Sequence, residues 1–166
     1  MNIAINGFGR IGRAVFKALL NKKDIKVVAI NDLTDTKTLA HLLQYDSCYG
    51  IYEKKVGFAA DSLTVDGKKY KVTAEKEPAN LPWREMKVDI VLDCTGKLTK
   101  QADLEAHLTA GAGKVILSAP VKEGEMKTIV LSVNEKDLTK DDKIISMASC
   151  TTNCLAPVTK IIRDNF

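Results

Sequence analysis

Hydrophobic positions near the start of the chain change their spacing twice. Residues 2–7 (NIAING) form a short apolar run that ends in glycine, and residues 25–32 (IKVVAIND) form a second run rich in β-branched side chains. Between them, residues 10–23 carry apolar side chains at the spacing typical of a helix. The apolar side chains expected on one helical face are Ile11, Val15, Ala18 and Leu19. The pattern predicts a strand–helix–strand unit, and such units nearly always cross over right-handed.

The rest of the chain repeats this alternation. Further strands are expected over residues 89–96, 113–120, 126–134 and 143–149. Further helices are expected over residues 35–45, 100–110 and 150–166, the last with Leu155, Val158, Thr159 and Ile162 on one side. Asp66-Gly67, between two strand-like runs, predicts a hairpin within residues 54–73. We therefore predict an α/β fold with a doubly wound, mostly parallel Rossmann-type sheet and helices on both faces.

The composition is consistent with one compact domain and does not change the predicted fold. The 166 residues are 45% hydrophobic, which is enough for one substantial core. The net charge of +4 is spread over scattered lysines, so we expect a solvated surface and no nucleic-acid partner. No apolar run is long enough to span a bilayer, and the N-terminus shows no secretion signal. We expect no membrane partner and a cytoplasmic location with reduced cysteines.

A glycine pattern follows the first predicted strand. Gly7, Gly9 and Gly12 form G-x-G-x-x-G at the start of a predicted helix, and Asp32 ends the next predicted strand about 20 residues later. The first glycine allows a tight turn, the second lets a pyrophosphate approach the backbone, and the third lets helix and strand pack closely. The helix N-terminus favours phosphates through its free N–H groups. Asp32 would accept hydrogen bonds from ribose hydroxyls and repel a 2′-phosphate, which predicts NAD and not NADP.

Two alternatives stay open at this loop. A glycine-rich turn in a Rossmann-like domain also serves other nucleotides, or none. Arg10 is either a solvated residue at the start of the helix or a contact to the pyrophosphate.

The cysteines differ in their expected environments. Cys150 stands between a predicted strand and a predicted helix, where the helical N–H groups favour the thiolate, so it is the candidate nucleophile. Cys48 and Cys94 lie in or beside apolar stretches and are expected to be buried and inert. Cys154, one turn after Cys150, leaves open a redox pair or half of a metal site. No third or fourth ligand accompanies it, so we expect no metal.

A thiol nucleophile next to a nicotinamide site has a specific chemical use. A thiolate that adds to an aldehyde gives a hemithioacetal, which becomes a thioester when it loses a hydride to nicotinamide. The thioester then passes its acyl group to a second nucleophile more readily than a serine ester would. Cys150 and the glycine loop together predict an NAD-dependent oxidoreductase that oxidises an aldehyde and transfers the acyl group.

Several segments resemble one known family. NIAINGFGRIGR, IND, YDS, PANLPW, CTG, SAP and above all ASCTTNCLAP resemble the phosphorylating, glycolytic type of glyceraldehyde-3-phosphate dehydrogenase. The likeness runs from Met1 to Phe166 and corresponds to the N-terminal half of the family's longer chain. It implies an NAD-binding domain over residues 1–149, followed over residues 150–166 by the first helix of a catalytic domain. The family's activating histidine lies further downstream, and neither His41 nor His107 matches it.

The resemblance also implies roles for individual residues. Cys150 matches the nucleophile, and Ser149 and Thr151 match contacts to the substrate or to the attacking phosphate. The residues that match cofactor contacts are Gly7, Gly9, Arg10, Ile11, Gly12, Asp32, Lys76, Thr95, Gly96 and Ser118. Within this set Lys76 corresponds to a position near the adenine, and Thr95, Gly96 and Ser118 to the nicotinamide-ribose side.

Two positions depart from the family pattern. Cys48-Tyr49 stand where many relatives have a small residue and a histidine. Leu98 stands where an aromatic residue is common beside the adenine. Leucine still offers an apolar face, so the expected consequence is a changed affinity for NAD.

The reaction that the resemblance implies is the NAD-dependent oxidation and phosphorylation of glyceraldehyde 3-phosphate to 1,3-bisphosphoglycerate in glycolysis. It also implies inorganic phosphate as a second substrate and a homotetramer for the full-length protein. Because the activating histidine lies outside these 166 residues, we expect them to bind NAD without turnover. Erythrose-4-phosphate dehydrogenase, which shares the same motifs, and a non-catalytic NAD-binding module are the alternatives.

Overall fold

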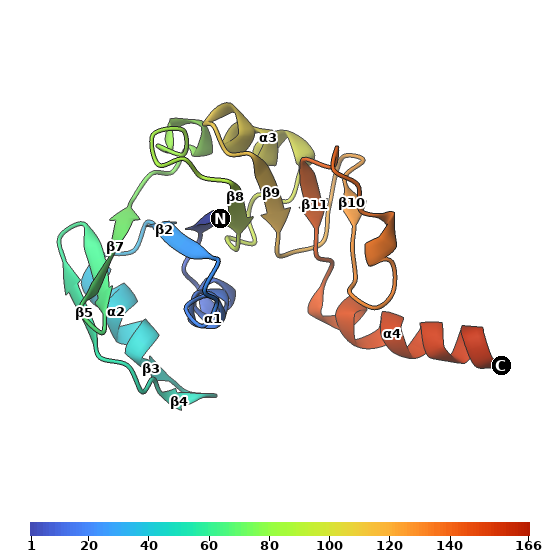
Figure 1. Ribbon diagram of the computed structural model, residues 1–166, viewed down its shortest axis with the longest axis horizontal. Helices are drawn as coiled ribbons and strands as arrows, with labels where there is room; N and C mark the ends of the chain where they lie inside the picture. Colours follow the sequence, from blue (N-terminus) through green and yellow to red (C-terminus); the bar gives the residue numbers. More distant parts are fainter.

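The computed structural model describes residues 1–166 (Figure 1). Its helices are α1 (Arg10–Leu19), α2 (Thr36–Gln44), α3 (Gln101–Thr109) and α4 (Cys150–Asn165), with short 3-10 turns at Pro78–Asn80 and Glu135–Asp137. Its strands are β1 (Asn2–Asn6), β2 (Lys26–Asn31), β3 (Tyr45–Asp46), β4 (Gly50–Ile51), β5 (Val56–Ala59), β6 (Ser62–Val65), β7 (Lys68–Thr73), β8 (Ile90–Asp93), β9 (Lys114–Leu117), β10 (Lys127–Thr128) and β11 (Ile144–Ser146). The alternation of strands and helices that the sequence predicts is confirmed.

The strands form one twisted sheet with the order β10-β11-β9-β8-β1-β2-β7-β6-β5, and β3 and β4 pair separately. All neighbours from β10 to β7 are parallel, whereas β6 and β5 are antiparallel. The chain runs outward from β1 through β2 to β7 and then returns to place β8 on the other side of β1. The strand order therefore reverses between β1 and β8, and ligands of such sheets bind at the carboxyl ends of the strands at this point.

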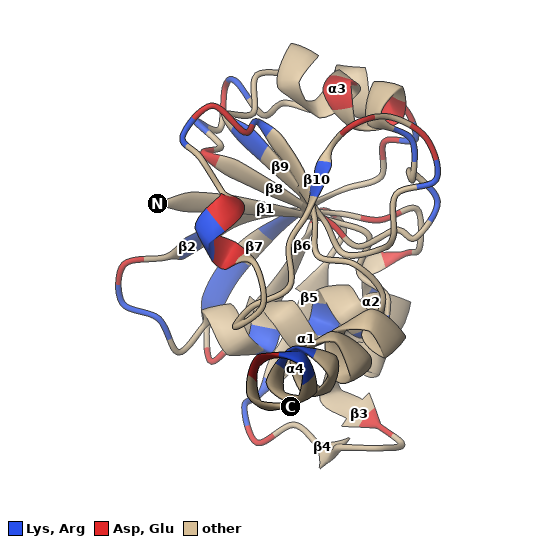
Figure 2. Ribbon diagram, turned by 90° about the vertical axis from the view of Figure 1, so that its right-hand side faces the viewer, with Lys and Arg blue, Asp and Glu red and all other residues tan.

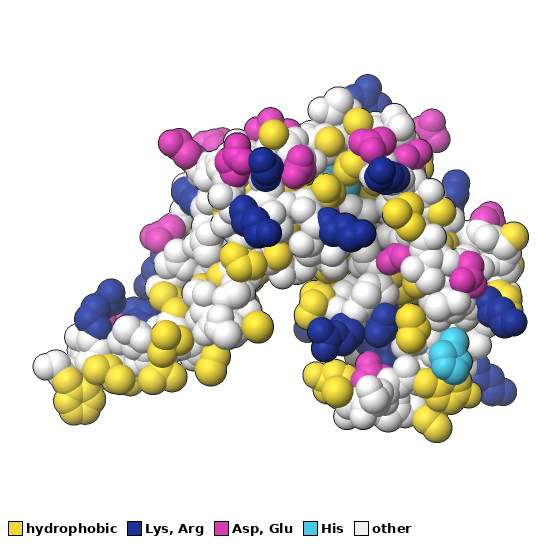
Figure 3. Space-filling model, turned by 180° about the vertical axis from the view of Figure 1, so that it is seen from behind, with side chains coloured by type: hydrophobic (Ala, Val, Ile, Leu, Met, Phe, Trp, Pro, Cys, Tyr) yellow, Lys and Arg dark blue, Asp and Glu magenta, His cyan; other side chains and the backbone are white.

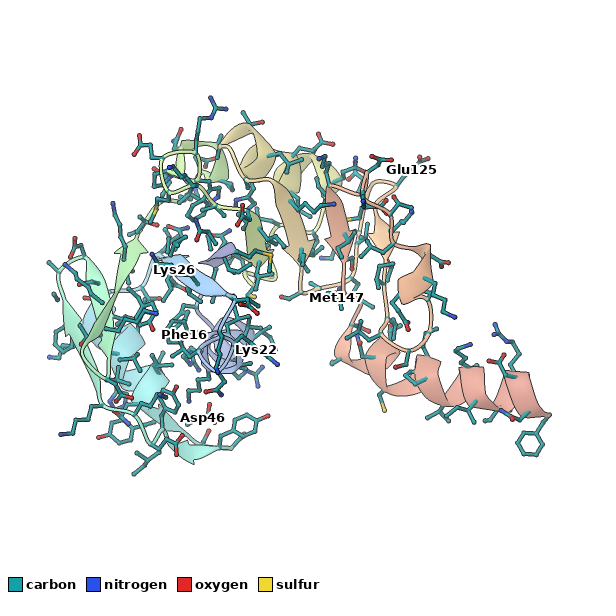
Figure 4. All side chains as sticks on the ribbon, in the orientation of Figure 1. Phe16, Lys22, Lys26, Asp46, Glu125 and Met147 are labelled. Carbon is teal, nitrogen blue, oxygen red and sulfur yellow. The ribbon has the colours of Figure 1, made fainter.

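The helices cover both faces of the sheet, as predicted. Figure 2 shows α1 and α2 below the sheet and α3 above it. On the first face, Phe16 of α1, labelled in Figure 4, packs edge-to-face against Phe8 and against Tyr70 of β7. On the second face, a smaller core surrounds the fully buried Trp83. The doubly wound, mostly parallel sheet is thus confirmed.

The buried face of α1 differs from the predicted one. Gly12 and Phe16 are the buried residues of this helix, whereas Ile11 is 53% exposed and Ala18 is exposed. The close approach of Gly12 to β1 sets the rotation of the helix and turns Ile11 toward solvent. The prediction that Ile11 and Ala18 share the core-facing side was wrong.

The hairpin predicted at Asp66-Gly67 is confirmed. β6 and β7 pair antiparallel on either side of these two residues, which have φ values of 49° and 79°. Positive φ at both central positions matches the two-residue turn that the sequence Asp-Gly favours.

The strand predicted over residues 126–134 is much shorter. Only Lys127–Thr128 pair with β11, and the chain then turns although Ile129 and Val130 are buried. The side chain of Asn134 replaces the sheet partners here: its Oδ1 accepts from the N–H of Val130 at 2.8 Å, and its Nδ2 donates to the carbonyl of Thr128 at 3.0 Å.

Helix α4 begins at Cys150 as predicted and projects from the body of the molecule (Figures 1 and 3). None of its residues is buried. Its large exposed apolar side chains are Leu155, Val158, Ile161 and Ile162, and Phe166 follows it. The division of the chain between residues 149 and 150 stays a prediction. No helix in the fold has the length and apolar character needed to cross a membrane.

Candidate functional site

The glycine loop joins β1 to α1 beside the point where the strand order reverses. Gly7 has a φ of 87°, and a Cβ there would lie 2.7 Å from the backbone nitrogen of Thr95. A Cβ at Gly12 would overlap the carbonyl oxygen of Gly7. Tight packing between the loop, the helix and the neighbouring Thr95 turn therefore requires glycine at both positions.

Gly9 is different, because nothing in the fold requires glycine there. Its φ of −70° is open to any residue, and a Cβ on it would meet no protein atom within 4 Å. A missing side chain at this position leaves the backbone accessible from the cavity side. This is the feature expected where a phosphate group approaches the main chain.

The first backbone N–H groups of α1 also have no hydrogen-bond acceptor within the protein. Its N-cap, Gly9, provides no side-chain hydrogen bond, and the first turn holds no acidic residue. Arg10 and Ile11 are exposed at this end of the helix. Unpaired N–H groups at a helix N-terminus favour an anion, so the residues present fit the pyrophosphate of a dinucleotide.

Asp32 is fixed at the end of β2 with its carboxylate beside the glycine loop. Oδ2 accepts from the N–H of Phe8 at 2.6 Å, and Oδ1 accepts from the N–H of Thr34 at 2.9 Å. Each oxygen keeps acceptor capacity for a further donor. Arg13 steadies the loop by donating to the carbonyl of Phe8 at 3.0 Å, and burial lowers the pKa of its guanidinium against the attraction of Asp46 and Asp32.

A cavity of about 630 Å³ lies over the carboxyl ends of β1, β2 and β8. It brings together five of the residues singled out as cofactor contacts: Gly7, Gly9, Asp32, Lys76 and Thr95. Leu98 lines it as well, and its place beside the adenine stays a prediction. Whether these residues bind NAD stays a prediction, but the fold places them around one space of ligand size.

The other singled-out residues do not line this cavity. Arg10 and Ile11 start α1, Gly12 is buried under the loop, and Gly96 follows Thr95 with a φ of 66°. Ser118 follows β9, where its N–H donates to the carbonyl of Asp93 at 2.9 Å. Their cofactor contacts remain predictions.

The sequence interpretation missed several lining residues. They are Asn6, Asn31, Leu33, Thr34, Glu75, Glu77, Pro78, Cys94, Lys97, Ala102, Asp103 and Ala106. Asn6 and Asn31 could have been found, because each is a polar residue at the end of an otherwise apolar strand of the predicted unit. The α3 residues could not, because only the tertiary fold brings this helix over the cavity.

Cys150 lies at the first position of α4, as predicted, and is exposed. The N-cap residue Ser149 accepts from the N–H of Thr152 at 3.0 Å, and its Oγ lies 2.8 Å from the hydroxyl of Thr151. Before it, Ala148 has a φ of 60° at the turn that follows Met147 (Figure 4). The roles of Ser149 and Thr151 toward a substrate stay predictions.

No imidazole lies at this helix end. His41 is on α2, at the opposite end of the molecule from α4, and His107 is fully buried in α3 (Figure 1). Cys154 is exposed one turn after Cys150. No group of three or more His, Cys, Asp or Glu side chains is placed to hold a metal ion.

The prediction that Cys48 is buried was wrong. Cys48 is exposed in the turn between β3 and β4, because this pair of strands lies outside the main sheet and has no layer above it. Cys94 is partly buried, and desolvation raises the pKa of its thiol to about 11 despite a hydrogen bond with Ser118.

We expect iodoacetamide to label Cys94 much more slowly than the exposed Cys48 at neutral pH. Raising the pKa from 9.0 to about 11 lowers the thiolate fraction of Cys94 by about a hundredfold, and only the thiolate reacts. Peptide mapping of a labelling time course gives both rates. The same measurement in urea is the control, since both thiols should then react alike. Equal rates in the folded chain would contradict the burial of Cys94.

Comparisons with known proteins agree with this geometry. Residues 1–101 match the family model of the glyceraldehyde 3-phosphate dehydrogenase NAD-binding domain. The chain is 54% identical over 166 residues to a glyceraldehyde-3-phosphate dehydrogenase from Mycoplasma pneumoniae, and the match covers 100% of this chain and 49% of that protein. It is 53% identical over 167 residues to the protein of the same name from Geobacillus stearothermophilus, covering 100% of this chain and 50% of the relative. The chain thus spans about half the length of the curated relatives it matches.

Proposed function

The chain belongs to the glyceraldehyde 3-phosphate dehydrogenase family, and we propose that it forms the NAD-binding part of an enzyme that oxidises and phosphorylates glyceraldehyde 3-phosphate. The observation that carries this proposal is Gly9. Neither backbone conformation nor packing requires glycine there, so its missing side chain is explained by a ligand that approaches the loop. The uncapped N-terminus of α1 and the cavity beside it supply the place for that ligand.

Different residues of the cavity would bind different parts of the cofactor. The glycine loop and the first amides of α1 would hold the pyrophosphate, and the free acceptor capacity of Asp32 suits the ribose hydroxyls. Leu98 and Pro78 offer apolar surface for a flat base. When bound, NAD supplies the acceptor for the hydride that the substrate loses.

Cys150 is proposed as the nucleophile. Its thiolate would add to the aldehyde carbon while the carbonyl oxygen takes up a proton, which gives a hemithioacetal. Loss of that proton to a base and of the hydride to the nicotinamide would leave a thioester. Inorganic phosphate then attacks the thioester carbon, which releases 1,3-bisphosphoglycerate and restores the thiolate. The position at the first turn of α4 supports this role, because free N–H groups there stabilise a thiolate, and the hydroxyls of Ser149 and Thr151 stand beside it.

A homotetramer for the protein of the relatives' length and a cytoplasmic location belong to the same proposal. They are supported only by the family membership, and light scattering of the full-length protein would test the first.

We expect wild-type protein to bind NAD at least tenfold more tightly than NADP. The carboxylate of Asp32 would repel a 2′-phosphate, and a hydrogen bond from a hydroxyl to a carboxylate contributes roughly 1.5–3 kcal/mol. Calorimetric titration of the 166-residue chain with each cofactor measures the two affinities. Equal or tighter binding of NADP would contradict the role of Asp32.

Asp32→Asn provides the matched variant. It keeps one acceptor oxygen and a similar shape but removes the negative charge, so we expect NADP binding to improve relative to NAD while the domain stays folded. Circular dichroism controls for folding. If the ratio of the two affinities does not move, the cofactor ribose lies elsewhere.

A further inference from the structure

A chain of buried polar side chains runs behind the cavity, along the carboxyl ends of β2, β1 and β8. Its members are nearly inaccessible to solvent: Asn31 at 4%, Asn6 at 3%, and Asp93, His107 and Trp83 at 0%. His107 comes from α3, and residues Ala102, Asp103 and Ala106 of the same helix line the cavity. The proposed chemistry uses neither His107 nor Asp93.

The hydrogen bonds of His107 define which of its nitrogens carries the proton. The indole N–H of Trp83 can only donate, and it lies 3.0 Å from Nδ1 of His107. Nδ1 is therefore the acceptor, and the proton of the neutral ring is on Nε2. Nε2 lies 3.3 Å from Oδ2 of Asp93 and also 3.3 Å from Nδ2 of Asn6. Of these two atoms only the carboxylate oxygen can accept, so Nε2 donates to Asp93.

Asp93 in turn connects this histidine to the wall of the cavity. Its Oδ2 also accepts from Nδ2 of Asn6 at 2.7 Å. Its Oδ1 accepts from the N–H of Thr95 at 3.1 Å and from the hydroxyl of Thr95 at 2.7 Å. The same hydroxyl accepts from the N–H of Lys97 at 3.2 Å. One oxygen of the carboxylate is thus held by the core, and the other holds the Thr95 turn that lines the cavity.

Asn6 and Asn31, the other members of this buried hydrogen-bond network, hold the opposite wall of the cavity at Glu75. Oδ1 of Asn6 accepts from Nδ2 of Asn31 at 2.7 Å. Asn31 then clamps the backbone of Glu75, donating to its carbonyl at 2.8 Å and accepting from its N–H at 2.9 Å. The hydrogen bonds run without a break from one wall, at Glu75, to the other, at Thr95.

We propose that His107 is a positioning residue of the NAD site: it orients the buried carboxylate of Asp93 and through it sets the Thr95 wall relative to the Glu75 wall. The proposal rests on NAD binding as the proposed function. The one ionisable partner of the Asp93 carboxylate in the core is His107, whose ring is neutral when Nδ1 accepts from Trp83, so the orientation of the carboxylate depends on neutral donors. Without the Nε2 proton of His107, the carboxylate keeps only Asn6 on its core side.

The test compares His107→Gln with His107→Leu in the 166-residue chain. Glutamine provides an NH₂ group that can donate and a carbonyl oxygen that can accept, whereas leucine provides neither, and both residues favour a helix. We expect His107→Leu to weaken NAD binding by about tenfold or more, because it leaves buried groups unpaired and frees the Thr95 wall. His107→Gln should restore binding to within about threefold of wild type. Trp83→Phe, which removes only the partner of Nδ1, should likewise bind NAD within about threefold of wild type.

A second measurement needs no cofactor. Amide hydrogen exchange of Thr95 reports its bond to Asp93 directly, and the exchange should be slow in wild type and in His107→Gln but fast in His107→Leu. If wild type does not bind NAD, the proposed function fails, while the Thr95 exchange still decides the role of His107. Wild-type NAD affinity together with slow Thr95 exchange in folded His107→Leu would overturn the proposal.

If His107→Leu does not fold, the ¹⁵N spectrum of the wild-type histidines decides. A buried ring protonated on Nε2, together with slow exchange at Thr95, supports the proposal. A ring protonated on Nδ1 overturns it, because Nε2 would then have no proton for Asp93. The single tryptophan, Trp83, reports folding of each variant that retains it by fluorescence.

Discussion

Gly12→Ala should strongly destabilise the chain, whereas Gly9→Ala should leave its stability nearly unchanged and weaken NAD binding. A Cβ at position 12 overlaps the backbone carbonyl of Gly7, which cannot rotate away as a side chain would. Overpacking of this kind costs about 3 kcal/mol, against a gain of about 1 kcal/mol from the better helix propensity of alanine. The net loss corresponds to a fall in Tm of roughly 4–8 °C for a chain of this size.

Gly9→Ala is the matched control, because it adds the same methyl group three residues before the position tested in the helix. No protein atom lies within 4 Å of that Cβ, and the backbone conformation is allowed for alanine. Thermal unfolding followed by circular dichroism measures the first effect, and calorimetric titration with NAD measures the second. If Gly9→Ala binds NAD like wild type, the phosphates do not lie against the loop. If Gly12→Ala is as stable as wild type, the loop and helix do not pack as described.

The second expected result is an absence of turnover. The 166-residue chain mixed with NAD, glyceraldehyde 3-phosphate and inorganic phosphate should form no detectable NADH. Cys150 stands at the start of α4 with hydroxyl groups around it and no imidazole, since His41 is on α2 and His107 is buried in α3. The loss of a general base alone lowers a rate by roughly 10²–10⁴-fold.

A full-length relative, such as the glyceraldehyde-3-phosphate dehydrogenase 1 of Bacillus subtilis, serves as the positive control for this assay. Alkylation of Cys150 in the same sample shows that the thiol is present and accessible. NADH formation that rises with the amount of chain and disappears in Cys150→Ser would place a working base inside these residues. The interpretation of the chain as half of an active site would then be wrong.

The local parts of the site could be predicted from the sequence because each depends on neighbouring residues. The strand, glycine turn and helix over residues 2–19, the Asp66-Gly67 hairpin and the position of Cys150 at a helix start are all set by backbone conformation and short-range periodicity. Gly7, Gly9 and Asp32, which the sequence predicted to meet around a ligand, line one cavity, whereas Gly12 does not. The family resemblance is confirmed by the match over residues 1–101.

Only the tertiary structure decided which side of α1 is buried, where Cys48 lies and what stands behind the cavity. Helical periodicity cannot give the rotation of α1, which follows from the contact between Gly12 and the Gly7 carbonyl. The apolar neighbours of Cys48 suggested burial, but its strand pair has no layer to cover it.

The buried hydrogen-bond network from Trp83 to Asn31 shows most clearly the difference between what local sequence predicts and what only the tertiary structure decides. Its members come from β1, β2, β8, α3 and the segment before β8, so no local pattern relates them. The sequence by itself determined the elements and the chemistry of the loop and the thiol, because these depend on residues close together in the chain. Hydrogen-bond partners such as His107 and Asp93 are fixed only when the sheet and α3 pack, because burial forces each polar group to find a partner among whatever the fold brings near it.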